Sequence, residues 1–369
     1  MLKNLPGKLD MEGTPVKMKL LDRVSRRSGE KPLHLSRDSA LPPDVAGFPE
    51  LQDENSRRQM NAKWSGADIP DQTGSVAIVT GANSGLGFHT CSMLAAKGAR
   101  VLMACRSVQR GNQAKEEILK ALPHAQLEFT ELDLADLESV RRSAETLHSS
   151  LDRLDLLINN AGVMAIPRQV TAQNFERQFG VNHLGHFALT GAMLPLLLNT
   201  PDSRIVNVSS LAHRSGRIDF SDLHGTRKYS RFAAYSQSKL ANLLFTVELH
   251  RRLQRKGAGT ISVAAHPGWA ATRLQYAGPS ETGSTIELHV MRTLNRLLAQ
   301  SAEQGALPQL YAATAPDVSG GDYIGPDGWM EMCGHPRKVT AKATALDENA
   351  ARDLWQVSVA HTGQMYNDL

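Results

Sequence analysis

Tyr235 and Lys239 lie four residues apart in a stretch that we predict to be helical. Four residues are about one helical turn, so both side chains emerge on the same face. A free phenol has a pKa of about 10, and an ammonium group beside it favours the phenolate and lowers that pKa. A phenol tuned in this way can exchange a proton with an alcohol or carbonyl oxygen. The same pair also occurs on solvated helix faces, so its meaning depends on the rest of the chain.

An apolar strand, a glycine turn and a helix precede this pair. Residues 76–79 predict a buried parallel strand, and a helix follows from about Gly85 until Gly98, a residue type typical of helix ends. Gly81, Gly85 and Gly87 let the backbone approach a ligand closely. The free N–H groups and the positive dipole end at the start of the helix would then face a bound anion. The sequence therefore predicts a pyrophosphate site, although its Gly-x-x-x-Gly-x-Gly spacing differs from the usual Gly-x-Gly-x-x-Gly fingerprint.

The end of the second predicted strand, residues 100–104, bears on the choice of cofactor. Sites that prefer NAD carry an acidic residue near this point, which binds the ribose 2′-hydroxyl. This chain has Arg106 there, with Arg110 nearby. A guanidinium suits a 2′-phosphate through charge-assisted, bidentate hydrogen bonds. We therefore predict NADP(H) rather than NAD(H), against the alternative that Arg106 is an ordinary surface arginine.

These motifs resemble the short-chain dehydrogenase/reductase family over residues 74–328. The resemblance implies that Asp133 and Leu134 contact the adenine ring, and that the Pro-Gly turn at 267–268, with Thr272, holds the nicotinamide carboxamide. It also implies that an Asn-Asn-Ala-Gly segment at 159–162 steadies the sheet and borders the cofactor. The expected cofactor-binding residues are Gly81, Asn83, Ser84, Gly85, Leu86, Gly87, Arg106, Asp133, Leu134, Asn160, Ala161, Gly162, Tyr235, Lys239, Pro267, Gly268 and Thr272.

The same resemblance implies a catalytic tetrad of Asn182, Ser210, Tyr235 and Lys239. Ser210, the second serine after strand 205–208, would donate a hydrogen bond to the substrate oxygen. Tyr235 would transfer the proton, and Lys239 would lower its pKa and bind the nicotinamide ribose. Asn182 would hold a water that links the lysine to solvent. Together these roles imply an oxidoreductase that interconverts an alcohol and a carbonyl.

The segment between Ser210 and Tyr235 is longer than in the commonest form of the family. With the motifs around it, this gap is similar to the retinol-dehydrogenase-like branch, near the protochlorophyllide reductases. We predict a small-molecule alcohol or carbonyl substrate of apolar character. Reduction of a carbon–carbon double bond is one alternative, and a non-catalytic NADP(H)-binding sensor is another. The intact tetrad argues against the sensor, which has no need of a tuned phenol.

Composition narrows the remaining functions. The formal charge of +4 is spread along the chain, without a dense basic run, and this argues against a nucleic-acid partner. His183 and His186 lie three residues apart, but a third ligand at metal spacing and a Cys-x-x-Cys motif are absent from the sequence, so we assign no metal. Three widely spaced cysteines suit a reducing compartment. We therefore expect a cytoplasmic location.

The chain divides into three parts by its patterning. We predict a disordered extension over residues 1–60, and a C-terminal helix and tail over 347–369. Between them, 61–346 predicts one doubly wound Rossmann-type α/β domain, with a parallel sheet of about seven strands and helices on both faces. An amphipathic lid over 272–300 would shape the substrate pocket, with a membrane-lying helix as the rival interpretation. We expect no membrane span, and the family resemblance leaves monomers and homo-oligomers open.

Overall fold

The computed structural model describes residues 63–270 and 299–369, which belong to one compact unit. The predicted extension at 1–60, Thr272 and nearly all of the predicted lid at 272–300 lie outside the described residues. The C-terminal helix expected after residue 346 is present as α11 (Glu348–Thr362), whose N-terminus is capped by the Asp347 carboxylate.

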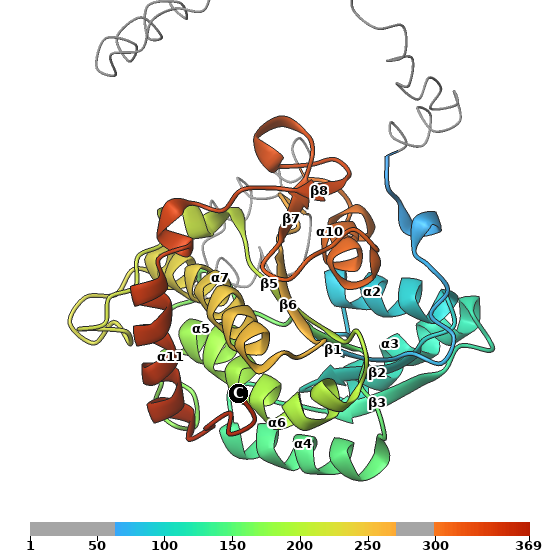
Figure 1. The fold of residues 1–369 in the computed structure, drawn as a ribbon, viewed down its shortest axis with the longest axis horizontal. Coiled ribbons are helices and arrows are strands. Elements are labelled where there is room, and N and C mark those ends of the chain that lie inside the picture. Colours follow the sequence, from blue (N-terminus) through green and yellow to red (C-terminus); the bar gives the residue numbers. More distant parts are fainter. Residues whose placement is uncertain (1–62, 271–298) are drawn as a thin grey trace, which may run out of the picture. The chain divides into compact units, whose positions relative to one another are not determined.

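A mostly parallel sheet forms the centre of the molecule (Figure 1). Its strand order is β3-β2-β1-β4-β5-β6-β7-β8, and all neighbours are parallel except the antiparallel pair β7 and β8. The strands are β1 (Val76–Thr80), β2 (Arg100–Cys105), β3 (Leu127–Glu131), β4 (Leu156–Asn159), β5 (Arg204–Val208), β6 (Ile261–Ala265), β7 (Tyr323–Pro326) and β8 (Pro336–Lys338).

This topology confirms the predicted doubly wound fold and its parallel sheet of about seven strands. Within the described residues β1 to β7 are parallel, and β8 adds an eighth, antiparallel strand at the edge. That strand, Pro336–Lys338, is three residues long and two of its residues are charged and exposed. Short, charged strands of this kind are typical of sheet edges, and they carry no hydrophobic alternation for a sequence pattern to reveal.

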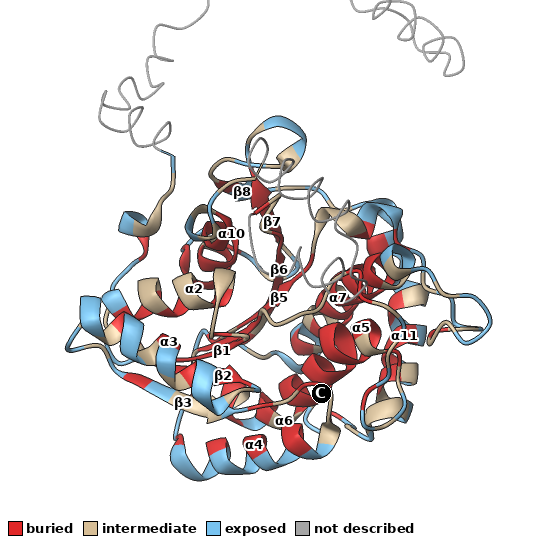
Figure 2. Cartoon of the chain, turned by 180° about the vertical axis from the view of Figure 1, so that it is seen from behind, coloured by how far each residue is buried: buried red, intermediate tan, exposed pale blue. Residues whose placement is uncertain are grey.

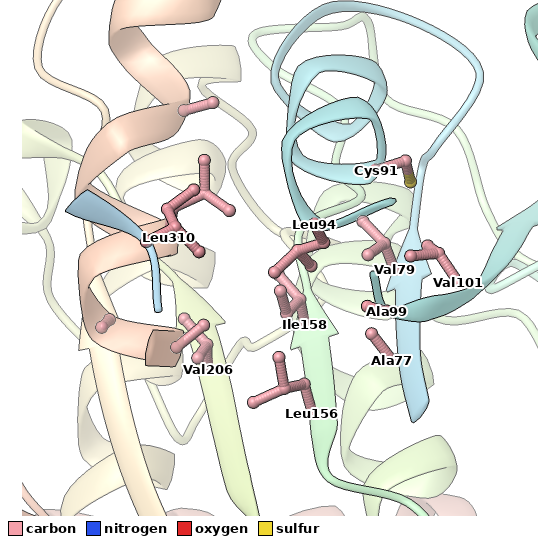
Figure 3. Close-up of a cluster of buried hydrophobic side chains, with 14 of the residues drawn as sticks. Ala77, Val79, Cys91, Leu94, Ala99, Val101, Leu156, Ile158, Val206 and Leu310 are labelled. Atoms are coloured by element: carbon pink, nitrogen blue, oxygen red, sulfur yellow. The ribbon is translucent and has the colours of Figure 1, made fainter. Parts of the chain in front are cut away.

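Helices cover both faces of the sheet. The main ones besides α11 are α2 (Gly85–Ala96), α3 (Val108–Ala121), α4 (Leu137–Ser150), α6 (Gly185–Asn199), α7 (Arg231–Lys256) and α10 (Ala302–Thr314). Successive strand residues point to opposite faces. Val79 therefore lies in one apolar cluster with Leu94 of α2 and Leu310 of α10, and Figure 3 shows Val79 beside Leu94. On the other face, Ile78 belongs to a cluster with Leu189 of α6 and Phe245 of α7.

Burial on both faces explains the unbroken apolar run of the first strand. Every residue of β1 is buried, and Figure 2 shows the central strands coloured as buried. The turn after β1 therefore starts from a strand that is packed on both faces. The carboxyl ends of the parallel strands all lie at the same end of the sheet. In open α/β sheets that end is where ligands bind, at the point where the strand order reverses between β1 and β4.

We expected no membrane span, but among the described residues one helix is long and apolar enough to cross a bilayer. It runs through Arg177–Asn199 and joins α5 (Arg177–Phe179), a π-helical turn (Gly180–Leu184) and α6. Its most apolar window has a mean hydropathy of 1.2, and 72% of that window is buried inside the protein. Such burial is the pattern of a core helix that packs against a sheet.

Candidate active site

Tyr235 and Lys239 lie together on α7, at the edge where the parallel strands end. The Lys239 Nζ atom is 5.7 Å from the centroid of the Tyr235 ring, so the predicted shared helix face is present. The Tyr235 phenol hydrogen-bonds to the side chain of Ser210, which follows β5. Two elements distant in sequence thus bring together a buried phenol, a buried ammonium group and the half-buried hydroxyl of Ser210.

The pKa of Tyr235 moves in the opposite direction to our prediction. Burial raises the pKa of this phenol to about 12, and the Ser210 hydrogen bond offsets only part of the rise. Lys239 Nζ donates instead to the Val208 carbonyl at 3.0 Å, and burial lowers the pKa of this lysine to about 8. Desolvation of the charged form is therefore the main cause of both pKa shifts. With this pKa, the Tyr235 phenol is protonated at neutral pH.

The two consecutive serines after β5 have different partners. Ser209 Oγ donates to the Lys239 carbonyl at 2.8 Å, which ties the strand end to α7. Ser210 Oγ accepts from the Ala212 N–H at 3.2 Å and is the serine that hydrogen-bonds to the Tyr235 phenol. The geometry therefore favours Ser210 as the serine of the reaction and gives Ser209 a structural task.

Asn182 lies in the π-helical turn Gly180–Leu184 and is fully buried. Its Nδ2 donates to the Val163 carbonyl and to Ser238 Oγ, both at 2.9 Å, and its Oδ1 accepts from the Val163 N–H at 2.8 Å. The side chain thus clamps the segment after β4 to the helix that carries Tyr235. A relay water at Asn182 stays a prediction, because the side chain is already engaged in this clamp.

A cavity of about 290 Å³ opens beside the glycine turn, at the carboxyl ends of β1, β2 and β4. It brings together eleven residues that the sequence predicted to bind the cofactor: Gly81, Asn83, Ser84, Gly85, Leu86, Arg106, Asp133, Leu134, Asn160, Ala161 and Gly162. The distant motifs of the nucleotide site therefore converge on one hollow.

The glycine turn has the shape that a dinucleotide requires. Gly81 has a φ of +69°, which favours glycine. A Cβ atom on Gly87 would lie 2.4 Å from the Gly81 carbonyl oxygen and 2.7 Å from Asn160 Nδ2, so only glycine lets the helix start this close to the turn. Asn160 Nδ2 in turn donates to the Thr80 carbonyl at 2.7 Å. The turn, the N-terminus of α2 and the cavity thus fit a pyrophosphate group.

Three guanidinium groups line the cavity. Arg106 and Arg110 are exposed beyond the end of β2. Arg177 also lines the cavity but was not predicted to do so. It lies in α5, far along the chain from Arg106, just before the turn that holds Asn182. Spacing along the chain gave no signal for Arg177, because it reaches the cavity only through the packing of its helix.

The Pro-Gly turn lies at the end of β6 and does not line this cavity. Gly268 has a φ of +62°, and a Cβ atom there would lie 2.4 Å from the Met332 carbonyl oxygen. Gln300 Nε2 donates to the Pro267 carbonyl at 2.7 Å. The predicted nucleotide contacts thus lie at the ends of β1, β2 and β4, whereas Ser210 follows β5 and the Pro-Gly turn follows β6.

The two histidines weighed as metal ligands have separate partners. His186 Nε2 lies 2.9 Å from Thr80 Oγ1, under the glycine turn. His183 Nε2 lies 2.8 Å from Ser358 Oγ on α11. Burial lowers the pKa of His183 to about 3 and that of His186 to about 4, so both rings are neutral. Each ring supports packing between elements rather than a shared site.

Comparisons with known proteins agree with this geometry. A family model described as short chain dehydrogenase matches residues 75–281. The chain belongs to the short-chain dehydrogenase family. It is 43% identical to human retinol dehydrogenase 13 over 303 residues, which cover 81% of this chain and 87% of that protein. It is also 41% identical to human retinol dehydrogenase 11 over 287 residues, covering 77% and 85% of the two chains.

Solved structures place this short-chain dehydrogenase in the same fold. A crystal structure of a Mycobacterium paratuberculosis protein superposes with a TM-score of 0.68 at 40% identity, covering 83% of this chain and 99% of that one. A second, from Beutenbergia cavernae, has a TM-score of 0.53 at 26% identity and covers 68% and 94% of the chains; it was assigned as an NAD(P)-dependent gluconate 5-dehydrogenase and contains NADP. The relatives named retinol dehydrogenase confirm the retinol-dehydrogenase-like resemblance found in the sequence.

Proposed function

We propose that this short-chain dehydrogenase interconverts an alcohol and a carbonyl with NADP(H), and that its substrate is apolar. The observation that carries the proposal is the hydrogen bond between the buried Tyr235 phenol and Ser210, with Lys239 beside the ring. A proton donor, a hydrogen-bond donor and a cation are what a carbonyl oxygen needs as it gains charge. The relatives named retinol dehydrogenase support an apolar substrate.

In the reducing direction the substrate oxygen accepts a hydrogen bond from Ser210 and a proton from Tyr235. Lys239 stabilises the charge left on the phenol and would hold the nicotinamide ribose. The residues around the cavity would hold the pyrophosphate and adenosine, and Pro267 and Gly268 the carboxamide. When bound, the cofactor supplies or accepts the hydride. In the oxidising direction Tyr235 receives the proton of the alcohol.

Several features support NADP(H) over NAD(H). Arg106 and Arg110 line the cavity at the end of β2, where an acidic residue would favour NAD. Arg177 adds a third positive group to the same cavity. Three guanidinium groups exceed what a pyrophosphate needs when a helix N-terminus already faces it, and a 2′-phosphate accounts for the surplus charge.

The proposal is tested by cofactor oxidation with purified protein. NADPH consumption is followed with two sets of compounds. The first set contains apolar and polar aldehydes and ketones, and the second contains compounds whose only reducible group is a conjugated carbon–carbon double bond. We expect turnover on apolar carbonyls. Activity confined to the second set would favour double-bond reduction, and tight NADPH binding without any turnover would favour the sensor.

The pKa values predict different pH profiles for the two directions. Alcohol oxidation requires the Tyr235 phenolate, and burial raises that pKa to about 12, so kcat/KM for oxidation should rise by about tenfold per pH unit near neutrality. Carbonyl reduction requires the phenol and the charged Lys239, whose pKa is about 8. Reduction should therefore be constant below pH 8 and fall above it. Profiles of the same slope in both directions would contradict this assignment.

A reducing location also belongs to this proposal. All three cysteines are free: Cys91 and Cys105 are buried, and Cys333 is exposed. An exposed thiol without a disulfide partner suits the cytoplasm. Microscopy of the tagged full-length chain, together with extraction of membranes by salt and by detergent, would show where the protein resides.

A further inference from the structure

Three aromatic rings form a row behind Ser210 and the Pro-Gly turn, and the proposed reaction uses none of them. The ring centroids of His213 and Tyr323 are 5.5 Å apart, and those of Tyr323 and His266 are 5.1 Å apart. All three side chains are buried. A Cβ atom on Gly325 of β7 would lie only 2.0 Å from His266 Nε2, so the His266 ring lies directly against the strand backbone.

His266 connects the Pro-Gly turn to a carboxylate. Its Nδ1 accepts from the Gly268 N–H at 3.2 Å, and its Nε2 lies 3.1 Å from Glu331 Oε2. Because Nδ1 accepts, Nε2 carries the proton and donates to the carboxylate, which defines one neutral tautomer. Burial lowers the pKa of His266, and this effect exceeds the opposing effect of Glu331. The ring is therefore a fixed connector with a donor at one end and an acceptor at the other.

Glu331 extends the connection to the loop after the catalytic serine. Its Oε2 is 2.8 Å from a guanidinium nitrogen of Arg214, which belongs to the 3-10 turn Leu211–Ser215 that Ser210 caps. Glu331 and its neighbour Met330 have φ values of +59° and +50°, a conformation that costs energy for non-glycine residues. A strained loop held in place by a half-buried ion pair indicates that the position of this carboxylate matters.

We propose that His266 and Glu331 are positioning residues for hydride transfer: through the Gly268 N–H and Arg214, they fix the Pro-Gly turn at a set distance from Ser210. The inference rests on the proposed function, in which the turn holds the nicotinamide carboxamide and Ser210 binds the substrate oxygen. Hydride donor and acceptor must meet within a narrow range of geometry. A connector between the two loops sets that geometry without touching either reactant.

The test compares His266→Gln with wild type in binding and turnover. A glutamine can still donate to Glu331 but has no acceptor at the place of Nδ1, so the Gly268 N–H loses its partner. We expect kcat to fall by about 10²-fold. In binding titrations, NADP+ should lose about fivefold in affinity, while 2′-phospho-ADP-ribose, which lacks the nicotinamide, should keep its affinity. Glu331→Leu should also lower kcat and the affinity for NADP+, and it provides the test if His266→Gln folds poorly.

Matched controls are His250→Gln and Glu138→Leu. His250 packs on Gly320, away from the turn, and Glu138 forms an exposed ion pair with Arg141. Both controls should keep wild-type kcat and both affinities. Variants at 266 and 331 that keep kcat within about threefold of wild type, or that weaken NADP+ and 2′-phospho-ADP-ribose equally, would overturn the inference. An inactive wild type would instead refute the proposed function.

Discussion

Replacing Tyr235 by Phe is expected to lower kcat by about 10²- to 10⁴-fold, the usual contribution of a positioned proton donor. The ring keeps its packing, since only the hydroxyl is removed. Ser210 Oγ retains the Ala212 N–H, and Lys239 Nζ retains the Val208 carbonyl. Folding and NADPH binding should therefore be unchanged. The measurement is kcat on the best carbonyl of the panel, with the NADPH Kd and the melting temperature recorded beside it.

The matched control for this variant is Tyr311→Phe. The Tyr311 hydroxyl donates to Asp317 at 2.7 Å on the outer side of α10, away from Ser210. Its loss should leave kcat unchanged. A Tyr235→Phe protein with kcat within threefold of wild type would show that another group donates the proton. That result would contradict the proposed chemistry.

Replacing Arg106 by Ala is expected to raise the KM for NADPH by about 10- to 100-fold, the equivalent of one or two charge-assisted hydrogen bonds. The KM for NADH should change by less than about threefold, because NADH has no 2′-phosphate for the guanidinium to bind. The ratio of kcat/KM for the two cofactors is the informative quantity, since it cancels any general loss of stability.

Two further variants define the origin of that preference. Arg110→Ala and Arg177→Ala should each reduce the NADPH preference by less than Arg106→Ala if the guanidinium at the end of β2 is the main ligand. Arg141→Ala, which removes an exposed arginine paired with Glu138 and Glu145, serves as the control. A wild-type protein that prefers NADH, or an unchanged cofactor ratio in Arg106→Ala, would contradict the predicted role of Arg106.

Much of the fold could be predicted because its signals are local. The run before Gly81 is apolar without alternation, which is typical of a strand buried on both faces, and β1 is buried throughout. The helix expected from Gly85 begins at that residue, and Gly98, expected just beyond its end, has a φ of +92°. The edge strand β8 and the π-helical turn at Asn182 were missed, because neither has a periodic pattern.

In the nucleotide site, too, the residues with local signals were predicted and those placed by packing were missed. Its glycine turn, Arg106 and the Asp133–Leu134 pair each follow a strand, and parallel strands place their ends at one edge. Those residues accordingly meet in one cavity. Arg177 was missed because its approach depends on how α5 packs. The lid at 272–300 and Thr272 fall outside the described residues, so the predicted lid and the role of Thr272 stay predictions.

The sequence alone determined the fold, the glycine turn and the shared face of Tyr235 and Lys239, since each depends on neighbours within a few residues. Tertiary structure decided that Asn182 is a clamp and that His266 joins Gly268 to Glu331. It also reversed the expected shift in the pKa of Tyr235. The physical reason is that burial and long-range contacts set the free energy of ionising a side chain. Neither can be read from spacing along the chain.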